Sequence, residues 1–286
     1  MHDIAGATGN TGKVAANLLL DRGKKVRVIV REVAKGAPFA ARGAEVAVAD
    51  LGDEKALTKA LDGAEGAYVL VPPKMNAPNF RAYQDATTTA IVGAVRASKV
   101  PHVVLLSSVG AERESGTGPI AGLHIAEQKL GALADTQSTF IRAGYFMENV
   151  GAALGALEQG IFPSFLPADL PIDMIATRDI GELAATLLIE GPAKGVVNLG
   201  GPAVTMRQVA AALSEIVGKT IPVVEAPLDG VVPTLTGFGF TEDLAGLYRQ
   251  MIGSFAAGEL TFEKQHRRVQ GKTPIQTVLR GLLGKG

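Results

Sequence analysis

The 286-residue chain has 28 Lys and Arg against 28 Asp and Glu, a formal net charge of zero, and 47% hydrophobic residues. The balanced charge argues against a nucleic-acid partner, which needs a basic face, and the hydrophobic content excludes a disordered chain. Because the sequence has no cysteine, disulfides and thiolate chemistry are excluded. The first predicted strand follows Met1 directly and no apolar run is long enough to span a membrane, so we expect a cytoplasmic protein without a membrane partner.

Short apolar runs alternate with amphipathic stretches in the first half of the chain. The runs predict strands at residues 3–5, 26–30, 45–49, 66–71, 103–106 and 139–141. The stretches between them predict helices at residues 12–22, 34–42, 54–61, 79–97 and 120–134. Strands that are apolar throughout and alternate with helices indicate an α/β fold, a doubly wound parallel sheet of the Rossmann type.

The pattern changes near residue 145, where the loops become richer in Pro and Gly. Further elements are predicted as helices at residues 177–189, 205–217, 238–257 and 275–283 and strands at 196–199 and 220–224. We expect a nucleotide-binding domain over residues 1–150, to which 177–200 return, and a smaller, discontinuous α/β cap over 151–286. A substrate pocket is expected between the two, with candidate lining residues Phe162, Phe165, Leu166, Phe238 and Phe240. Packing in the core of the cap is the alternative for these rings.

The strongest motif is a glycine loop between the first strand and the first helix. Gly6 allows a tight turn, Gly9 lets the backbone approach a pyrophosphate, and Gly12 lets the helix pack closely on the strand. Free N–H groups at the start of the helix then face the phosphates. The residues between the glycines, which offer further donors, are Thr8, Asn10 and Thr11. The strand–loop–helix context favours a dinucleotide site over a plain glycine-rich turn.

The spacing of the glycines points to a known family. Residues 6–12, 30–31, 48–50, 106–108 and 144–149 together resemble the NmrA-like family of atypical short-chain dehydrogenases/reductases. The resemblance covers nearly the whole chain. It implies a Rossmann fold and an NADP(H)-dependent function, since the family includes NADPH-dependent quinone and azo reductases and regulators that sense the NADP/NAD state.

The residue after the second strand bears on the choice between NADP and NAD. An NAD-selective site has Asp or Glu there, whereas this chain has Arg31, with Lys35 four residues further on. A guanidinium holds a 2′-phosphate through paired hydrogen bonds. The resemblance also implies this role for Arg31, so we expect NADP(H). The alternative is a solvated basic loop, in which Glu32 works against an anion site.

Other cofactor contacts are expected at the ends of the third and fourth strands. The resemblance implies that Asp50 meets the adenine amino group and that Leu51 lies beside the ring. Capping of the helix near Asp53 is an alternative role for Asp50. Val71 and Pro72 end the fourth strand, at the edge of the sheet where ligands of doubly wound proteins bind.

The nicotinamide half is expected near the fifth and sixth strands. Ser107 stands at the end of the fifth strand, and the resemblance implies that Tyr145 and Phe146 line the nicotinamide and substrate side. Turn formation for Ser107 and core packing for Phe146 are the alternatives.

The Tyr-x-x-x-Lys pair of many short-chain dehydrogenases is absent. The Tyr position is His124, the Lys position is Gln128, and Lys129 falls on another side of the helix. We name His124, as proton donor, and Tyr145 as candidate catalytic residues. No His, Asp and Glu have metal-ligand spacing, so no metal site is predicted.

Two functions remain open at this point. One is hydride transfer to an electron-poor, aromatic small molecule such as a quinone or azo compound. The other is a redox-sensing regulator that binds NADP(H) without turnover. A sugar-nucleotide epimerase is disfavoured by the missing Tyr and Lys. The sequence leaves open whether the chain forms a homo-oligomer.

Overall fold

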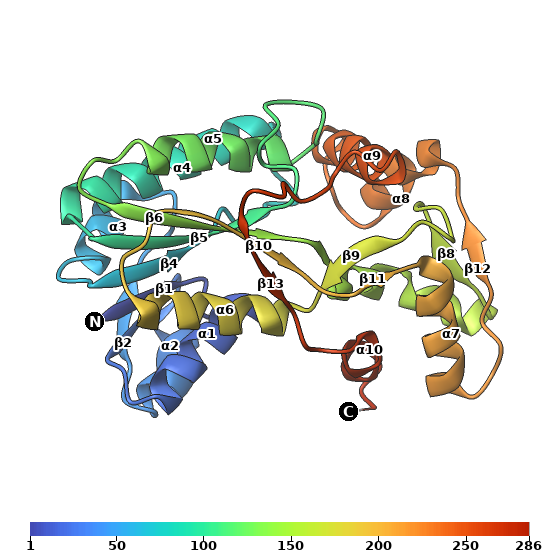
Figure 1. Cartoon of the computed structure of the whole chain (residues 1–286), viewed down its shortest axis with the longest axis horizontal. Coiled ribbons are helices and arrows are strands. Elements are labelled where there is room, and N and C mark those ends of the chain that lie inside the picture. Colours follow the sequence, from blue (N-terminus) through green and yellow to red (C-terminus); the bar gives the residue numbers. More distant parts are fainter. Residues whose placement is uncertain (286) are drawn as a thin grey trace.

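A large parallel sheet runs through the centre of the molecule, of which the computed structural model describes residues 1–285 (Figure 1). Its strands are β1 (His2–Ala5), β2 (Val26–Val30), β3 (Glu45–Val48), β4 (Gly66–Val69), β5 (His102–Ser108), β6 (Gln137–Ala143), β10 (Gly195–Gly200) and β13 (Arg267–Gln270). Their spatial order is β13-β10-β6-β5-β4-β1-β2-β3, and every neighbouring pair is parallel. The chain winds outward from β1 to β3 and then continues on the other side of β1, so the winding reverses between β1 and β4.

Helices cover both faces of this sheet, as Figure 1 shows. One face carries α1 (Asn10–Asp21), α2 (Val33–Ala40) and α6 (Thr177–Glu190), and the other carries α3 (Glu54–Ala60), α4 (Phe80–Ser98) and α5 (Ile120–Gly131). Alternate residues of each strand feed the two cores: Ile4 packs with the α1 and α6 side chains, whereas Ala5 packs with those of α3 and α4. The doubly wound Rossmann-type sheet predicted from the sequence is therefore confirmed.

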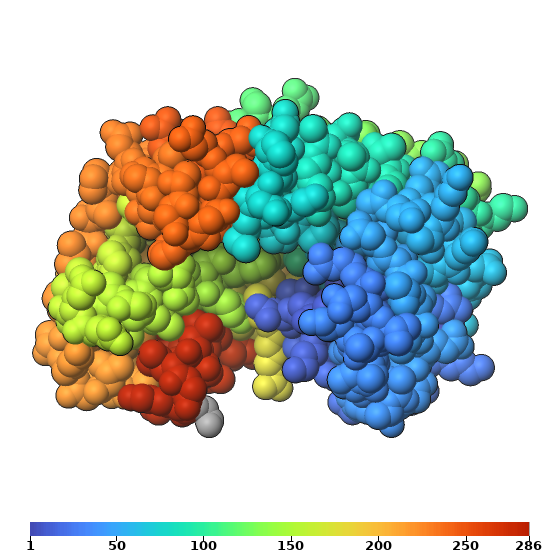
Figure 2. Space-filling view, turned by 180° about the vertical axis from the view of Figure 1, so that it is seen from behind, coloured from blue at the N-terminus to red at the C-terminus, as the bar shows by residue number. Residues whose placement is uncertain are grey.

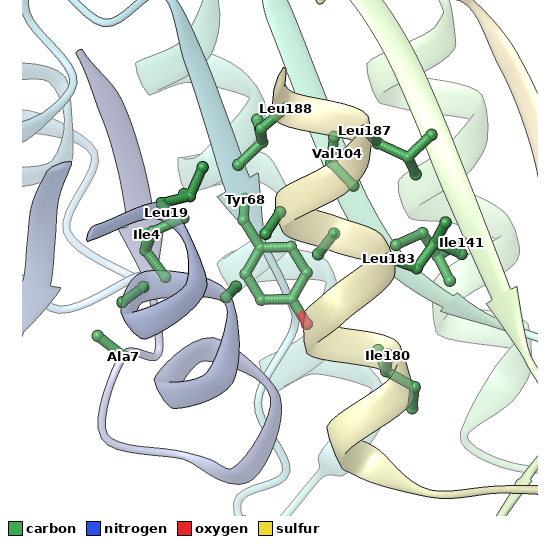
Figure 3. Packing of buried hydrophobic residues seen from close by; sticks show 14 of the residues in the cluster. Ile4, Ala7, Leu19, Tyr68, Val104, Ile141, Ile180, Leu183, Leu187 and Leu188 are labelled. Carbon is green, nitrogen blue, oxygen red and sulfur yellow. The ribbon is translucent and has the colours of Figure 1, made fainter. Parts of the chain in front are cut away.

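The core beneath α1 and α6 fixes the start of α1 (Figure 3). Tyr68 of β4 lies fully buried between the two helices, and its hydroxyl donates a hydrogen bond to Thr11 Oγ1 (2.8 Å). A Cβ on Gly181 of α6 would lie 2.4 Å from the Thr11 carbonyl oxygen, so the helices touch backbone to backbone. Burial of each large side chain here contributes about 2 kcal/mol, which holds the glycine loop against a rigid support.

The remaining elements form a smaller α/β region. They are β7 (Tyr145–Phe146), η1 (Met147–Gln159), β8 (Phe162–Ser164), β9 (Ile172–Ile175), β11 (Ala203–Val204), α7 (Met206–Val217), β12 (Val223–Glu225), η2 (Leu228–Gly230), α8 (Val231–Gly237), α9 (Glu242–Ala256) and α10 (Ile275–Leu282). Two small sheets, β11-β9-β7 and β12-β8, organise this region around its own hydrophobic core. Because β7 directly follows β6, the region begins at the carboxyl edge of the large sheet.

The helix predicted for residues 238–257 is confirmed as α9, which begins four residues later than predicted, at Glu242, whereas the short α8 before it was not predicted. Gly239 has a φ of +87°, which prevents α8 from continuing. Thr241 then caps the start of α9, because its side chain accepts a hydrogen bond from Leu244 N. The strands β7, β8, β9, β11 and β13 were not predicted, because each has only two to four residues and shows no period. The polar β13 lies at an edge of the sheet, where Arg267 and Arg268 are exposed.

Helix α9 is fastened across the carboxyl edge of the large sheet. Thr241 N donates to the carbonyl of Met75 in the loop after β4 (3.0 Å), and Asp243 caps α4 by accepting from Phe80 N (2.8 Å). Gln250 accepts from Gly118 N in the loop after β5 (3.0 Å). The helix is therefore held by the loops that follow two neighbouring strands, where ligands of such sheets bind.

Candidate functional site

The glycine loop has the close approaches that its motif predicts. Gly6 has a φ of +63°, a conformation that side chains disfavour, and its carbonyl accepts a hydrogen bond from Gly9 N (2.8 Å). A Cβ on Gly12 would lie 2.4 Å from the Gly6 carbonyl oxygen. Only glycine at position 12 lets the first turn of α1 pack on the end of β1 in this way.

The start of α1 is open to an anion. Gly9 is the N-cap residue, so no side chain caps the helix, and its first turn carries no acidic residue. Thr8 and Asn10 are exposed beside it. Thr11 is different, because its hydroxyl is buried against Tyr68, and it therefore offers its backbone N–H to a ligand. The unpaired N–H groups and the helix dipole favour a phosphate at this end of α1.

Basic residues stand at the next strand end. Arg31 follows β2 directly and Lys35 lies in the first turns of α2, and both side chains are exposed. Burial raises the pKa of the nearby Tyr83 phenol, with smaller effects from Asp50, which raises it, and Arg31, which lowers it. Arg31 follows β2 and Asp50 lies in the loop after β3, so both are on the β1–β3 side of the point where the winding reverses.

The loop after β3 assigns a local role to Asp50. Its Oδ1 accepts a hydrogen bond from Gly52 N (2.8 Å), and it leaves the capping of α3 to Asp53, which accepts from Ala56 N (3.0 Å). The alternative in which Asp50 caps the helix is therefore wrong. Leu51, beside it, is half-buried.

The end of the fourth strand also lies at this edge. β4 ends at Val69, two residues earlier than predicted, and Val71 and Pro72 follow it half-buried. A Cβ on Gly6 would lie 2.9 Å from Leu70 Cδ2, so the segment after β4 touches the glycine loop. The ends of β1 and β4, on either side of the reversal, are thus in direct contact.

Ser107 stands at the carboxyl end of β5, but its side chain is turned under α5. The hydroxyl is buried and donates a hydrogen bond to Glu127 Oε1 (2.5 Å). Glu127 in turn holds Arg142 of β6 through Nε (3.0 Å) and Nη2 (2.7 Å). Ser107 is therefore left with its backbone for any contact to a ligand.

Arg142 is the centre of a buried ionic network that sequence reasoning missed. Besides Glu127 it contacts Glu112 (3.3 Å) and Glu263 (2.5 Å). It therefore joins helix α5, the loop after β5 and the segment before β13 to the sheet. These charge-assisted bonds hold the Arg142 pKa above its ordinary value, against the opposing effect of burial, which is the largest single cause acting on it. A signal was available in α5, where Glu127 falls on the same helix face as the buried Ile120 and Leu130.

The two candidate catalytic side chains differ in their surroundings. His124 is half-buried, and its Nδ1 donates to the Ala111 carbonyl (2.8 Å), so a neutral ring presents a bare Nε2 that accepts rather than donates. Tyr145 packs edge-on against Phe255 of α9, with ring centroids 5.3 Å apart. Burial raises the pKa of Tyr145 to about 12, so its phenol stays protonated at neutral pH. The next residue, Phe146, packs instead against the core of the large sheet.

The residues predicted to line the pocket differ in how far they are buried. Phe162 and Leu166 are buried in the core of the smaller region, so their assignment to a pocket is wrong. Phe238 is 57% exposed at the end of α8, and Phe240 packs edge-on against Tyr248 of α9. Figure 2 shows the surface hollowed between the blue N-terminal segment and the yellow-green segment near residue 150, with the orange helices α8 and α9 alongside.

Metal-binding and membrane-spanning features are both absent from residues 1–285. No group of three or more His, Asp or Glu is arranged to hold a metal ion within that range. No helix in it is long and apolar enough to cross a membrane.

Comparison with known proteins gives the family. The model of the NmrA-like family matches residues 3–269. The chain belongs to the NmrA-like family. The family predicted from the sequence motifs is therefore confirmed.

The sequence similarity to two named reductases extends over most of this NmrA-like chain. An NAD(P)H azoreductase from Xenophilus azovorans is 28% identical over 254 residues, which are 87% of this chain and 85% of that protein. Quinone oxidoreductase 2 from Escherichia coli (strain K12) is 30% identical over 253 residues, covering 85% and 84% of the two chains.

Solved structures agree with the NmrA-like fold. The NADPH complex of an Escherichia coli NADPH-dependent quinone oxidoreductase superposes with a TM-score of 0.81 at 26% identity, covering 99% of this chain and 100% of the other. A triphenylmethane reductase from Citrobacter sp., complexed with NADP(H), gives 0.82 at 21% identity, covering 99% and 100%. The second likeness shows the fold alone.

The residues present in this NmrA-like chain fit a dinucleotide. The cradle at residues 6–12 has no space for a Cβ at Gly12, the N-terminus of α1 carries no cap, and Arg31 is exposed at the neighbouring strand end. These are the features that a pyrophosphate and a ribose phosphate require.

Proposed function

We propose that the chain is an NADPH-dependent reductase that transfers hydride to a small, electron-poor acceptor such as a quinone or an azo compound. The observation that carries the proposal is the uncapped N-terminus of α1 at the glycine loop, beside the point where the sheet winding reverses. The names of the azoreductase and quinone oxidoreductase relatives, at 28% and 30% identity, support the class of acceptor.

Each part of the cofactor has a set of residues to hold it. The pyrophosphate lies on the N–H groups of Asn10, Thr11 and Gly12, while Gly6 and Gly9 keep the backbone clear. Arg31, with Lys35, holds the 2′-phosphate, and the free carboxylate oxygen of Asp50 accepts from the adenine. The bound nicotinamide supplies the hydride.

The nicotinamide half lies over the ends of β4, β5 and β6. Val71 and Pro72 form one side of it, and Tyr145 and Phe146 form the other. The chain's part in the chemistry is to orient the two reactants and to exclude water from between them. His124 donates a proton to the acceptor only in its doubly protonated form, because its Nδ1 hydrogen is held by Ala111.

A redox-sensing regulator without turnover is the second candidate. It is favoured by the missing Tyr and Lys and by the internal bonds that occupy the Ser107 hydroxyl and the Nδ1 of His124. Such a protein would bind NADP(H) and change its affinity for a protein partner with the state of the cofactor.

The test follows the loss of reduced-nicotinamide absorbance with a panel of quinones, azo dyes and triphenylmethane dyes, using NADPH and NADH in turn. We expect acceptor-dependent oxidation that favours NADPH. Clear NADP(H) binding without oxidation by any acceptor would support the regulator instead.

The 2′-phosphate assignment has its own experiment. Arg31→Ala removes a charge-assisted hydrogen bond of about 2 kcal/mol, so we expect the KM for NADPH to rise about 30-fold while that for NADH stays within about twofold. Arg96→Ala is the matched control, because it removes an equally exposed arginine at the far end of α4. Equal losses for NADPH and NADH in Arg31→Ala would overturn the assignment.

A further inference from the structure

A pair of hydroxyl groups joins the glycine loop to an inner strand of the large sheet. Tyr68 of β4 has no exposed surface, and its hydroxyl donates a hydrogen bond to Thr11 Oγ1 (2.8 Å). Thr11 is 6% exposed and is the second residue of α1. The bond therefore connects β4 directly to the first turn of the helix that follows the glycine loop.

The surroundings of this pair are apolar. The buried side chains that share the core beneath α1 and α6 with Tyr68 are hydrocarbons, among them Ile4, Leu19 and Ile180 (Figure 3). Tyr68→Phe together with Thr11→Val would keep the shapes of both side chains and remove both polar atoms. Exchanging the two partners of a buried hydrogen bond for apolar groups of the same shape costs little stability. The stability of the core therefore gives no reason for the two hydroxyls.

Thr11 is held at two points that fix the direction of its backbone. Its hydroxyl is bonded to Tyr68, and its carbonyl oxygen lies against α6, where a Cβ on Gly181 would come within 2.4 Å of it. Its N–H is one of the first four of α1 and has no acceptor inside the helix. One contact to β4 and one to α6 prevent the first turn from rotating about the helix axis, so this N–H keeps a constant direction.

We propose that Tyr68 is a positioning residue for the cofactor: through the hydroxyl of Thr11 it aims the N–H groups of the first turn of α1 at the pyrophosphate. The inference rests on the proposed function, in which the pyrophosphate lies at the start of α1. Donors whose direction is fixed before the ligand arrives bind it more tightly, because binding does not have to order them. Tyr68 acts only through Thr11, since its own hydroxyl is sealed in the core.

NADPH and adenosine 2′-monophosphate separate the pyrophosphate from the rest of the cofactor, because both carry the adenine and the 2′-phosphate but only NADPH carries the pyrophosphate. The experiment measures the Kd of each ligand by titration calorimetry for wild type, Tyr68→Phe, Thr11→Val and the double variant. The melting temperature of each protein is measured without ligand. Ser138→Ala is the matched control, because it removes a buried hydroxyl that donates to the Leu130 carbonyl (3.1 Å) at the amino end of β6.

In both single variants we expect the Kd for NADPH to rise about fivefold, the effect of one hydrogen bond, and the Kd for adenosine 2′-monophosphate to stay within about twofold. The melting temperature should fall in each single variant, because one buried hydroxyl is left without its partner, and should recover in the double variant. The Kd for NADPH should stay raised in the double variant, because the bond from Thr11 to β4 is still missing. Ser138→Ala should lower the melting temperature and leave both Kd values unchanged.

Three results would overturn the role of Tyr68. If NADPH affinity recovers together with the melting temperature in the double variant, the pair serves stability alone. If both ligands lose affinity equally, the substitutions disturb the whole site, and if NADPH affinity is unchanged in every variant, the loop needs no support from Tyr68. The proposed function fails separately, because a wild type that binds NADPH and oxidises it with no acceptor leaves all of these binding measurements intact.

Discussion

The buried carboxyl group of Asp3 makes the stability of the fold depend on pH. Asp3 lies in β1 with no exposed surface, and burial raises the pKa of its carboxyl group to about 7. Arg27 opposes the shift through an ion pair at 3.2 Å, but its guanidinium is shared with the carbonyls of Ala60 and Asp62. The second carboxylate oxygen, Oδ1, has no partner in residues 1–285.

The direction of the effect follows from where the proton is held. Between pH 4 and 7 the folded chain keeps a proton on Asp3 that the unfolded chain has released, since the ordinary pKa is 3.8. The free energy of unfolding therefore falls as the pH rises through this window and levels off above it. A shift from 3.8 to about 7 corresponds to about 4 kcal/mol at most.

The assay compares urea unfolding of wild type and Asp3→Asn from pH 4 to pH 8. The amide cannot ionise, so we expect the stability of Asp3→Asn relative to wild type to rise with pH by up to about 4 kcal/mol and then to stay constant. His2 and His102, whose pKa values are lowered mainly by burial, titrate in both proteins, and the difference removes their contribution. A difference that stays flat across the window would show that Arg27 keeps Asp3 ionised and would refute the reasoning.

Two further predictions concern the glycine loop and the ionic network. Gly12→Ala pushes the Gly6 carbonyl, so we expect NADPH affinity to fall at least 10-fold and the melting temperature to drop, whereas Gly281→Ala, a helical position with open space around its Cβ, should leave the affinity unchanged and should not lower the melting temperature. Arg142→Met leaves the buried Glu127 without its cationic partner and should cost about 3–5 kcal/mol in urea unfolding. The double variant Arg142→Met/Glu127→Leu should recover most of that loss. A double variant as unstable as the single one would show that the loss does not come from the buried Glu127 carboxylate.

The sequence predicted the large sheet because its signals are local. Each strand from β1 to β6 is an apolar run bounded by turn residues, and the glycine loop lies within seven consecutive residues at the end of the first one. The start of α9 was predicted four residues too early, although Thr241 and the two acidic residues after it form a helix start.

The orientation of single side chains was beyond the sequence. The position of Ser107 at the end of β5 followed from the strand pattern, but the carboxylate that binds its hydroxyl comes from α5, 20 residues further along. Tyr248 carries no motif, and its position depends on packing against the cluster of Phe80, which lies more than 100 residues away. Such contacts are set by the packing of α9, which no local pattern encodes.

The two halves of the candidate site therefore have different origins in the chain. The proposed phosphate and adenine half lies within the first 51 residues, at strand ends whose spacing is fixed by the sheet. The proposed acceptor half involves α9, which the Thr241–Met75 and Gly118–Gln250 hydrogen bonds hold over the same edge. Because α9 packs near the ends of β4 to β6, whereas Arg31 and Asp50 follow β2 and β3, a substitution on its Tyr248 face should change the choice of acceptor without changing the preference for NADPH.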